Sequence, residues 1–157
     1  MNIIESIVAY LCIHYPYSGE LSKTRLTKLV YLADWFSALA FNRQMTNINW
    51  VFNHYGPYVD DVIDTVSSNG NFSIEYSLNY YGTERTTISF NGLEENINLT
   101  EIEQKTLDLV ISKTSPMYFN DFIKYVYSTY PIVNSNRYSH LNLVELAKEC
   151  REQDNLN

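Results

Sequence analysis

The chain of 157 residues carries 11 basic and 18 acidic residues, which gives a formal charge of −7, and 45% of its residues are hydrophobic. This composition is ordinary for a globular protein, and the length is enough to bury most of the unfolded surface in one core. We therefore predict a single domain over residues 1–157. The excess of acidic residues disfavours general nucleic-acid binding, because phosphate backbones repel a negative protein.

The apolar start of the chain predicts neither a secretion signal nor a membrane span. The run Asn2–Ile13 is short, has no basic start and contains Glu5. Cys12 and Cys150 lie at opposite ends of the chain, each in a helical pattern, which is typical of reduced thiols packed as small apolar groups. These features predict a cytoplasmic protein without a membrane segment.

Two helices are expected in the first quarter of the chain. Apolar residues at three- and four-residue steps predict a helix over about Asn2–His14, with Asn2 as its cap. The same pattern predicts a second helix over about Ser22–Phe41, which Ser22 or Thr24 can cap. Both helices have an apolar side that a core would cover.

A change from extended chain to helix is expected at the sequence HYGPYVDD. The segment Ile48–Phe52 before it has one apolar face, as a strand does. We expect Gly56 to turn the chain and Pro57 to occupy the first position of a new helix, where its missing N–H is not needed. Asp60 and Asp61 would then lie in the first turn, where the helix dipole favours negative charge.

The rest of the chain predicts one hairpin and three helices. Strict alternation over Phe72–Phe90 predicts a β-hairpin, and Ile48–Phe52 is a candidate third strand of its sheet. Helices are expected over about Thr100–Lys113, which opens with a capping box, Phe119–Ser128 and Leu141–Gln153, with a polar connection before the last. The predicted fold is therefore mainly α (α+β), a helical domain with a small antiparallel β-sheet.

No catalytic or metal-binding motif is evident. The sequence has no phosphate- or dinucleotide-binding glycine loop, no H-E-x-x-H and no G-x-S-x-G. The three histidines lie far apart, without a second ligand at metal-binding spacing. Asp60, Asp61 and Asp64 form a carboxylate cluster, but acids at the beginning of a helix are more often dipole partners than ligands. We predict no catalytic residue, no metal and no cofactor.

A DNA-binding regulator is an alternative. The predicted helices Thr100–Lys113 and Phe119–Ser128 imitate the two helices of a helix-turn-helix, and Lys105, Lys113 and Lys124 would provide a positive face. The second of these helices has few of the Arg, Asn and Gln side chains that form hydrogen bonds with base edges. Nucleic acid is therefore the less favoured partner.

Two stretches of the chain together resemble a known family. Leu26–Asp34 has the form L-x-K-L-x-Y-x-A-D, and Tyr55–Val59 has the form Y-G-P-x-V. In this order they resemble the Panacea domain, the antitoxin module related to the SocA antitoxin. Tyr127–Pro131 and Leu141–Glu149 are similar to the end of that family, so the resemblance covers nearly the whole chain. Tyr58 departs from the small aliphatic residue that the family often has there, which alters the local surface.

The resemblance implies an antitoxin of a two-gene toxin–antitoxin pair. Such proteins mostly neutralise a protein toxin by direct binding, and one branch delivers its toxin to a protease; the domain is not known as an enzyme. The count of 14 tyrosines suits a protein interface, although a genome rich in A and T would also raise it. An acidic binder also suits a basic partner, because complementary charge speeds association.

The resemblance places the candidate partner-binding residues on these two stretches and directly beside them. They are Lys28, Tyr31, Asp34, Trp35, His54, Tyr55 and Tyr58. We interpret Gly56 and Pro57 as structural, with His54, Tyr55 and Tyr58 in a surface groove beside the helix. The alternative for Lys28, Tyr31 and Asp34 is an interior polar network, because residues three apart share one side of a helix.

The predicted hairpin is a second candidate for recognition. An exposed hairpin edge can take up a strand from a partner, although most hairpins only cover a core. The sequence alone leaves both possibilities open.

Overall fold

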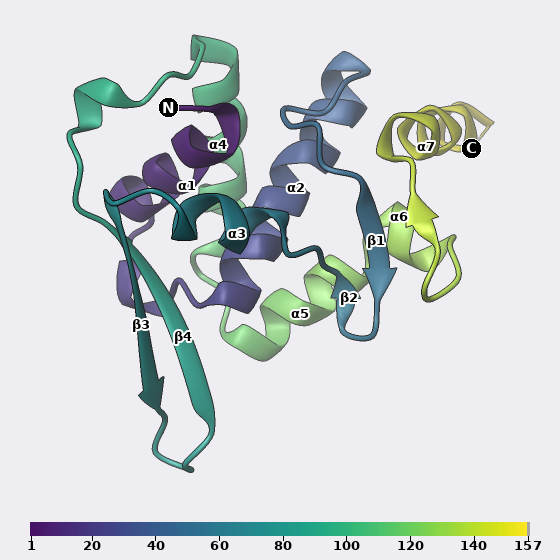
Figure 1. Cartoon of the computed structure of the whole chain (residues 1–157). Coiled ribbons are helices and arrows are strands. Elements are labelled where there is room, and N and C mark those ends of the chain that lie inside the picture. Colours follow the sequence, from purple (N-terminus) through teal and green to yellow (C-terminus); the bar gives the residue numbers. More distant parts are fainter. Residues whose placement is uncertain (157) are drawn as a thin grey trace.

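The computed structural model describes residues 1–156 and confirms a mainly α fold with small antiparallel β structure (Figure 1). The helices are α1 (Ile3–His14), α2 (Lys23–Phe41), α3 (Asp61–Ser67), α4 (Glu101–Thr114), α5 (Phe119–Tyr127), α6 (Tyr130–Val133) and α7 (Leu143–Leu156), with short 3-10 turns η1 (Ser18–Glu20) and η2 (Glu94–Asn96). The strands are β1 (Trp50–Asn53), β2 (Gly56–Pro57), β3 (Phe72–Leu78), β4 (Glu84–Phe90) and β5 (His140–Leu141).

The predicted caps begin three of the helices. The Asn2 side chain accepts the N–H of Glu5 and the Glu5 side chain accepts the N–H of Asn2, which completes a capping box at α1. Thr100 and Glu103 do the same at α4. Ser22 accepts the N–H of the third residue of α2. These local signals explain why the helices begin where the sequence predicts.

The strands form two separate sheets, and the expectation that Ile48–Phe52 joins the hairpin is wrong. β3 pairs only with β4, whereas β1 pairs on one side with β2 and on the other with β5, all antiparallel. One reason lies at the body-facing edge of β4. There the Ile88 N–H donates to the Leu21 carbonyl, so the chain before α2 occupies the edge that a third strand would need.

Pro57 lies in a strand, and its expected place at the first position of a helix is wrong. It lies opposite Phe52 in the β1–β2 pair, and α3 begins only at Asp61. The Tyr58 N–H donates to the Val51 carbonyl, so the ladder continues one residue beyond the proline. Pro57 is tolerated because β2 is an edge strand of two residues, where the missing N–H breaks no further pairing.

The predicted polar connection before the last helix contains two short elements. Helix α6 has Pro131 in its first turn, where a proline fits. Leu141 then pairs with Trp50 in the β1–β5 ladder, so α7 begins at Leu143 and not at Leu141 as predicted. The long-range pairing of β5 with β1 decides where the last helix begins.

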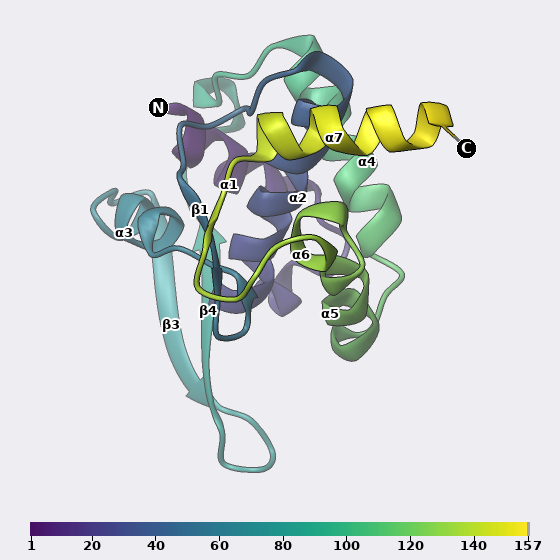
Figure 2. The same ribbon diagram turned by 90° about the vertical axis from the view of Figure 1, so that its right-hand side faces the viewer.

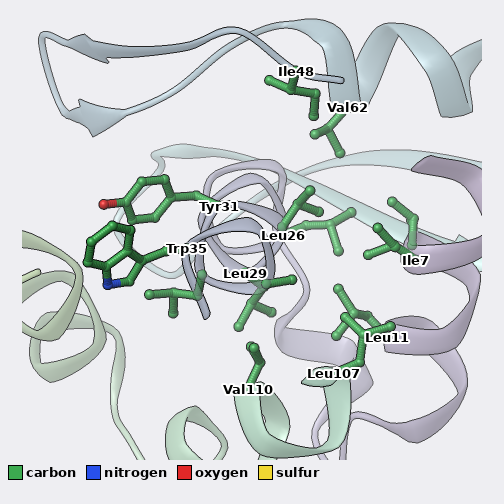
Figure 3. Close-up of a cluster of buried hydrophobic side chains, with 14 of the residues drawn as sticks. Ile7, Leu11, Leu26, Leu29, Tyr31, Trp35, Ile48, Val62, Leu107 and Val110 are labelled. Atoms are coloured by element: carbon green, nitrogen blue, oxygen red, sulfur yellow. The ribbon is translucent and has the colours of Figure 1, made fainter. Parts of the chain in front are cut away.

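Helix α2 lies at the centre of the core. Every residue from Arg25 to Trp35 is buried, so α2 has neighbours on all sides. Figure 3 shows side chains of α1, α4 and the Ile48–Val62 region gathered around it. Each fully buried Leu or Ile contributes about 1.5–3 kcal/mol relative to exposure, so this packing is the main source of stability.

The last helix, α7, packs against the C-terminal end of α2. In Figure 2, α7 lies across α2, and Arg151 donates from Nη1 to the carbonyls of Ala38 (3.1 Å) and Leu39 (2.9 Å). Its Nη2 also donates to the side chain of Asn42, the left-handed C-cap of α2. A cation on the free carbonyls of a helix end stabilises the helix through its dipole.

Candidate partner-binding surface

Asp34 ties α2 to the sheet from the inside of the protein. Its fully buried carboxylate accepts the Thr46 N–H (2.9 Å), the Thr46 hydroxyl (2.5 Å), the Trp50 indole N–H (2.8 Å) and the Gln44 amide (3.3 Å). Burial raises the pKa of Asp34 to about 6, although the hydrogen bonds from Thr46 and Trp50 act in the opposite direction. The arrangement serves to hold β1 against α2.

Tyr31 and Trp35 also lie in the core (Figure 3). The Tyr31 hydroxyl is 2.9 Å from the hydroxyl of Thr129, which links α2 to the chain before α6. The Tyr31 ring stands edge-on to Trp50 with 5.5 Å between ring centroids, a favourable aromatic geometry. Burial raises the pKa of Tyr31 above its ordinary value.

Lys28 is buried beneath Tyr58 without a counter-charge. Its side chain is only 1% exposed, and its Nζ has no hydrogen-bond partner in the part of the chain that the structure describes. Nζ lies 5.8 Å from the centroid of the Tyr58 ring, and the Nζ of Lys23 lies 5.7 Å from the same centroid. Burial lowers the pKa of Lys28 to about 8.

Lys28, Tyr31 and Asp34 therefore do not form the single network that their spacing suggests. At about 100° per residue, Asp34 points about 120° away from Lys28 around the helix axis. Each of the three side chains faces a different neighbour: Tyr58 for Lys28, Thr129 for Tyr31, and Thr46 for Asp34. All three side chains are buried, as the alternative of an interior role predicts, but each contacts a different part of the chain.

Gly56 and Pro57 are buried and form β2, directly after the turn. Gly56 has a φ of 98°, a region that residues with a side chain rarely adopt. A Cβ atom at this position would lie 3.2 Å from Cε2 of Tyr127. The close approach of α5 and the backbone angle both favour glycine, which supports the structural interpretation of this pair.

His54 and Tyr55 lie on the exposed turn between β1 and β2, and Tyr138, from the chain before β5, lies beside them. The His54 ring stands edge-on to Tyr55 at 4.5 Å, and its Nδ1 is 3.0 Å from the Tyr138 hydroxyl. Tyr55 is 75% exposed and Tyr138 is 66% exposed. We name these three residues the aromatic corner. Tyr138 is absent from the sequence prediction because nothing local indicates that β5 pairs with β1.

The structure thus divides the seven predicted residues into three groups. Four are in the core: Lys28, Tyr31, Asp34 and Trp35. His54 and Tyr55 are exposed, and Tyr58 is half-buried between the core and the surface. The structure therefore does not bring all seven together on one surface.

A pocket of about 550 Å³ lies between the start of α2, the β4 side of the hairpin and the start of α5. Lys23, Arg25 and Arg85 supply positive charge to its lining, and Tyr118 and Phe119 supply aromatic surface. The Arg25 guanidinium is buried and donates to the Met117 carbonyl at 2.8 Å. No pattern in the sequence indicates this pocket, because only the fold brings its three segments together.

Within residues 1–156, no group of three or more His, Cys, Asp or Glu side chains is arranged to hold a metal ion. None of the helices described combines the length and apolar character that a membrane crossing requires.

Comparison with known families gives a match over the central part of the chain. The model of the family described as antitoxin SocA-like, Panacea domain, matches residues 26–131, more than half of the chain. The chain belongs to the SocA-like antitoxin family. No curated protein and no solved structure matches it.

The SocA-like segment contains most of the surface described above. It runs from α2 through the β1–β2 turn, the hairpin and α5, and ends at Pro131. Helices α1 and α7 and strand β5 lie outside it, although α7 and β5 contact its elements directly. All seven predicted partner-binding residues fall inside this segment.

Proposed function

We propose that this protein is the antitoxin of a toxin–antitoxin pair and neutralises a protein toxin, encoded by an adjacent gene, by binding it directly. Membership of the SocA-like family supports a toxin as the partner. The observation that best supports direct binding is a set of exposed aromatic side chains on the surface of the protein. They are Tyr55, Tyr76, Tyr80, Tyr81, Tyr118 and Tyr138.

Exposed tyrosines of this kind are typical of binding surfaces. Tyrosine buries a large apolar area and keeps one polar group for a hydrogen bond, and it is enriched at protein interfaces and their energetic centres. In this proposal His54, Tyr55 and Tyr58 contact the toxin. Lys28 and its neighbours on α2 act from behind, by fixing the position of Tyr58 and of strand β1.

The charge of the protein supports a basic partner. The formal charge of −7 attracts a positively charged protein at long range, and this attraction speeds association more than it strengthens the final complex. We place the encounter in the cytoplasm, where both proteins would be made. The proposal includes no catalytic step, cofactor or nucleic acid.

Growth and co-purification test the proposal together. The neighbouring open reading frame is expressed alone and then with this protein carrying an affinity tag. We expect arrested growth in the first case, and rescue with a co-eluting complex in the second. A harmless neighbour that does not co-elute would contradict the proposal.

The same experiment separates masking from degradation. Rescue accompanied by disappearance of the toxin from the lysate would assign the protein to the alternative role, delivery of the toxin to a protease. A protease-deficient host provides the control, because direct binding predicts equal rescue there and protease delivery predicts none.

A further inference from the structure

We propose that the outer edge of β3 pairs with an extended, basic segment of the toxin, which adds a third strand to the hairpin. The identity of the partner rests on the proposed function. The place of contact rests on the hydrogen-bond register of the hairpin, its exposure and its charge.

The register shows which backbone groups of β3 point outward. At the two ends of the ladder, the Asn79 N–H donates to Thr83 (2.9 Å) and the Asn91 N–H donates to Asn71 (2.7 Å). Antiparallel strands alternate hydrogen-bonded and non-bonded pairs, so the odd-numbered residues of β3 bond to β4 and the even-numbered ones face away. The outward Ile88 N–H, bonded to Leu21, shows the same alternation on β4.

Ile74, Tyr76 and Leu78 are the outward-facing residues at the open part of this edge. Apart from the hairpin itself, no group within residues 1–156 forms a hydrogen bond with the main-chain N–H or C=O of these three residues. Tyr76 is 82% exposed and Leu78 is 68% exposed. In Figures 1 and 2 the hairpin extends beyond the helices, and α3 lies beside the end of β3 that is nearer the body of the protein.

The edge lacks three of the usual protections against another strand. Proteins commonly blunt an exposed edge with lysine, proline or a bulge. The sequence of β3, FSIEYSL, has neither lysine nor proline, and its register with β4 is unbroken over all seven residues. By contrast, the β4 edge is covered at Ile88 and bridged at Thr87 by the chain before α2. The β3 edge is therefore the free position for strand addition.

The charge near this edge favours a basic strand. Residues 59–90 contain five acidic residues and one basic residue. Asp61 and Asp64 lie on α3, which packs against β3, and Glu75 lies on the strand itself. Among the described residues, none of these three carboxylates is in an ion pair. A second copy of this chain would bring like charges together, so we commit to a basic partner segment.

Proline substitution at matched positions tests the edge. Tyr76→Pro removes an outward N–H and places a ring against an incoming strand, while the bonds to β4 stay intact. Thr86→Pro makes the same change at the cross-strand partner, on the opposite edge. With the adjacent-gene product as probe, we expect Tyr76→Pro to weaken Kd by at least about tenfold and Thr86→Pro by less than about threefold.

Residue-resolved amide exchange gives a test that needs no variant. In the free protein, the amides of Ser73, Glu75 and Ser77 should exchange more slowly than those of Tyr76 and Leu78. In the complex, the amides of Tyr76 and Leu78 should become protected as well. Unchanged exchange at these two residues, in a complex that forms, would overturn the inference and leave the proposed function standing.

Two further outcomes bear on the partner. Slower association of Glu75→Lys, with the dissociation rate little changed, is expected for a basic segment; faster association would overturn its basic character. Dimerisation of this chain alone that Tyr76→Pro abolishes would overturn the choice of a toxin segment in favour of a second copy. Failure of the wild-type protein to bind the probe at all is a failure of the proposed function.

Discussion

The buried ammonium of Lys28 lies over the ring of Tyr58, and neither this ammonium nor the Tyr58 hydroxyl has a hydrogen-bond partner within residues 1–156. The ammonium nitrogen lies 5.8 Å from the centroid of the tyrosine ring, and the Tyr58 hydroxyl is itself buried. The ring face offers the cation a modest attraction, but less than water or a carboxylate would. Lys28 is thus held in the core at a cost in stability, directly behind a candidate contact residue.

Replacing Lys28 by methionine is expected to stabilise the protein at about pH 7 by about 2–3 kcal/mol, because it removes a buried and unpaired charge. The pKa of Lys28 falls from 10.5 to about 8 on folding. Between these values the unfolded chain binds more protons than the folded one, so wild-type stability rises with pH relative to the variant. Urea unfolding at pH 7 and near pH 10 measures this, and a pH-independent difference would count against a buried ammonium.

Replacing Asp34 by alanine is expected to destabilise the protein by about 2–4 kcal/mol, because the buried donors of Thr46 and Trp50 lose their acceptor. The pKa of Asp34 rises from 3.8 to about 6 on folding, so the folded state binds the proton more tightly. Wild-type stability should therefore fall as pH rises from about 4 to about 6, and the variant should lack this slope. Denaturant titrations across this range compare the two proteins.

Gly56→Ala is expected to destabilise the protein by about 1–3 kcal/mol, because the backbone angle and the Tyr127 ring both oppose a Cβ atom. Gly19→Ala is the matched control. Nothing lies within 4 Å of a Cβ at Gly19, and its effect should stay below about 0.5 kcal/mol. Thermal unfolding of the two variants gives the comparison, and equal midpoints would refute the structural role of Gly56.

Tyr55→Ala is expected to weaken toxin binding by at least about 1 kcal/mol, because an exposed aromatic side chain at an interface contributes most of its energy only when it is covered. Its Tm should stay unchanged, since the side chain packs little in the free protein. Leu93→Ala, also at an exposed position but beside η2, serves as the control. Calorimetric titration with the toxin measures the affinity of both variants. Equal affinities of Tyr55→Ala and Leu93→Ala would show that the aromatic corner does not contact the toxin.

Local signals in the sequence account for much of the fold. The capping residues Asn2, Ser22 and Thr100 and the apolar periodicity predict three helices, and strict alternation predicts the hairpin at Phe72–Phe90. These features depend on neighbours a few residues away. Pro57 shows the limit, because its place in a strand depends on pairing with Phe52 and not on its own preference.

The candidate site depends more on long-range contacts. The pairing of β5 with β1 brings Tyr138 to His54, and no pattern in the intervening sequence indicates it. The burial of Lys28 follows from the position of α2 at the centre of the core, which periodicity cannot distinguish from a helix with one exposed side. The sequence therefore identifies the segments, and the fold decides which side chains face outward.

Titration of the purified toxin with this purified protein, with toxin activity as the readout and no protease present, tests direct neutralisation most directly. If neutralisation is direct, inhibition rises linearly with added protein and reaches its end point at a fixed molar ratio, as in a tight complex. Full toxin activity at every ratio would contradict it.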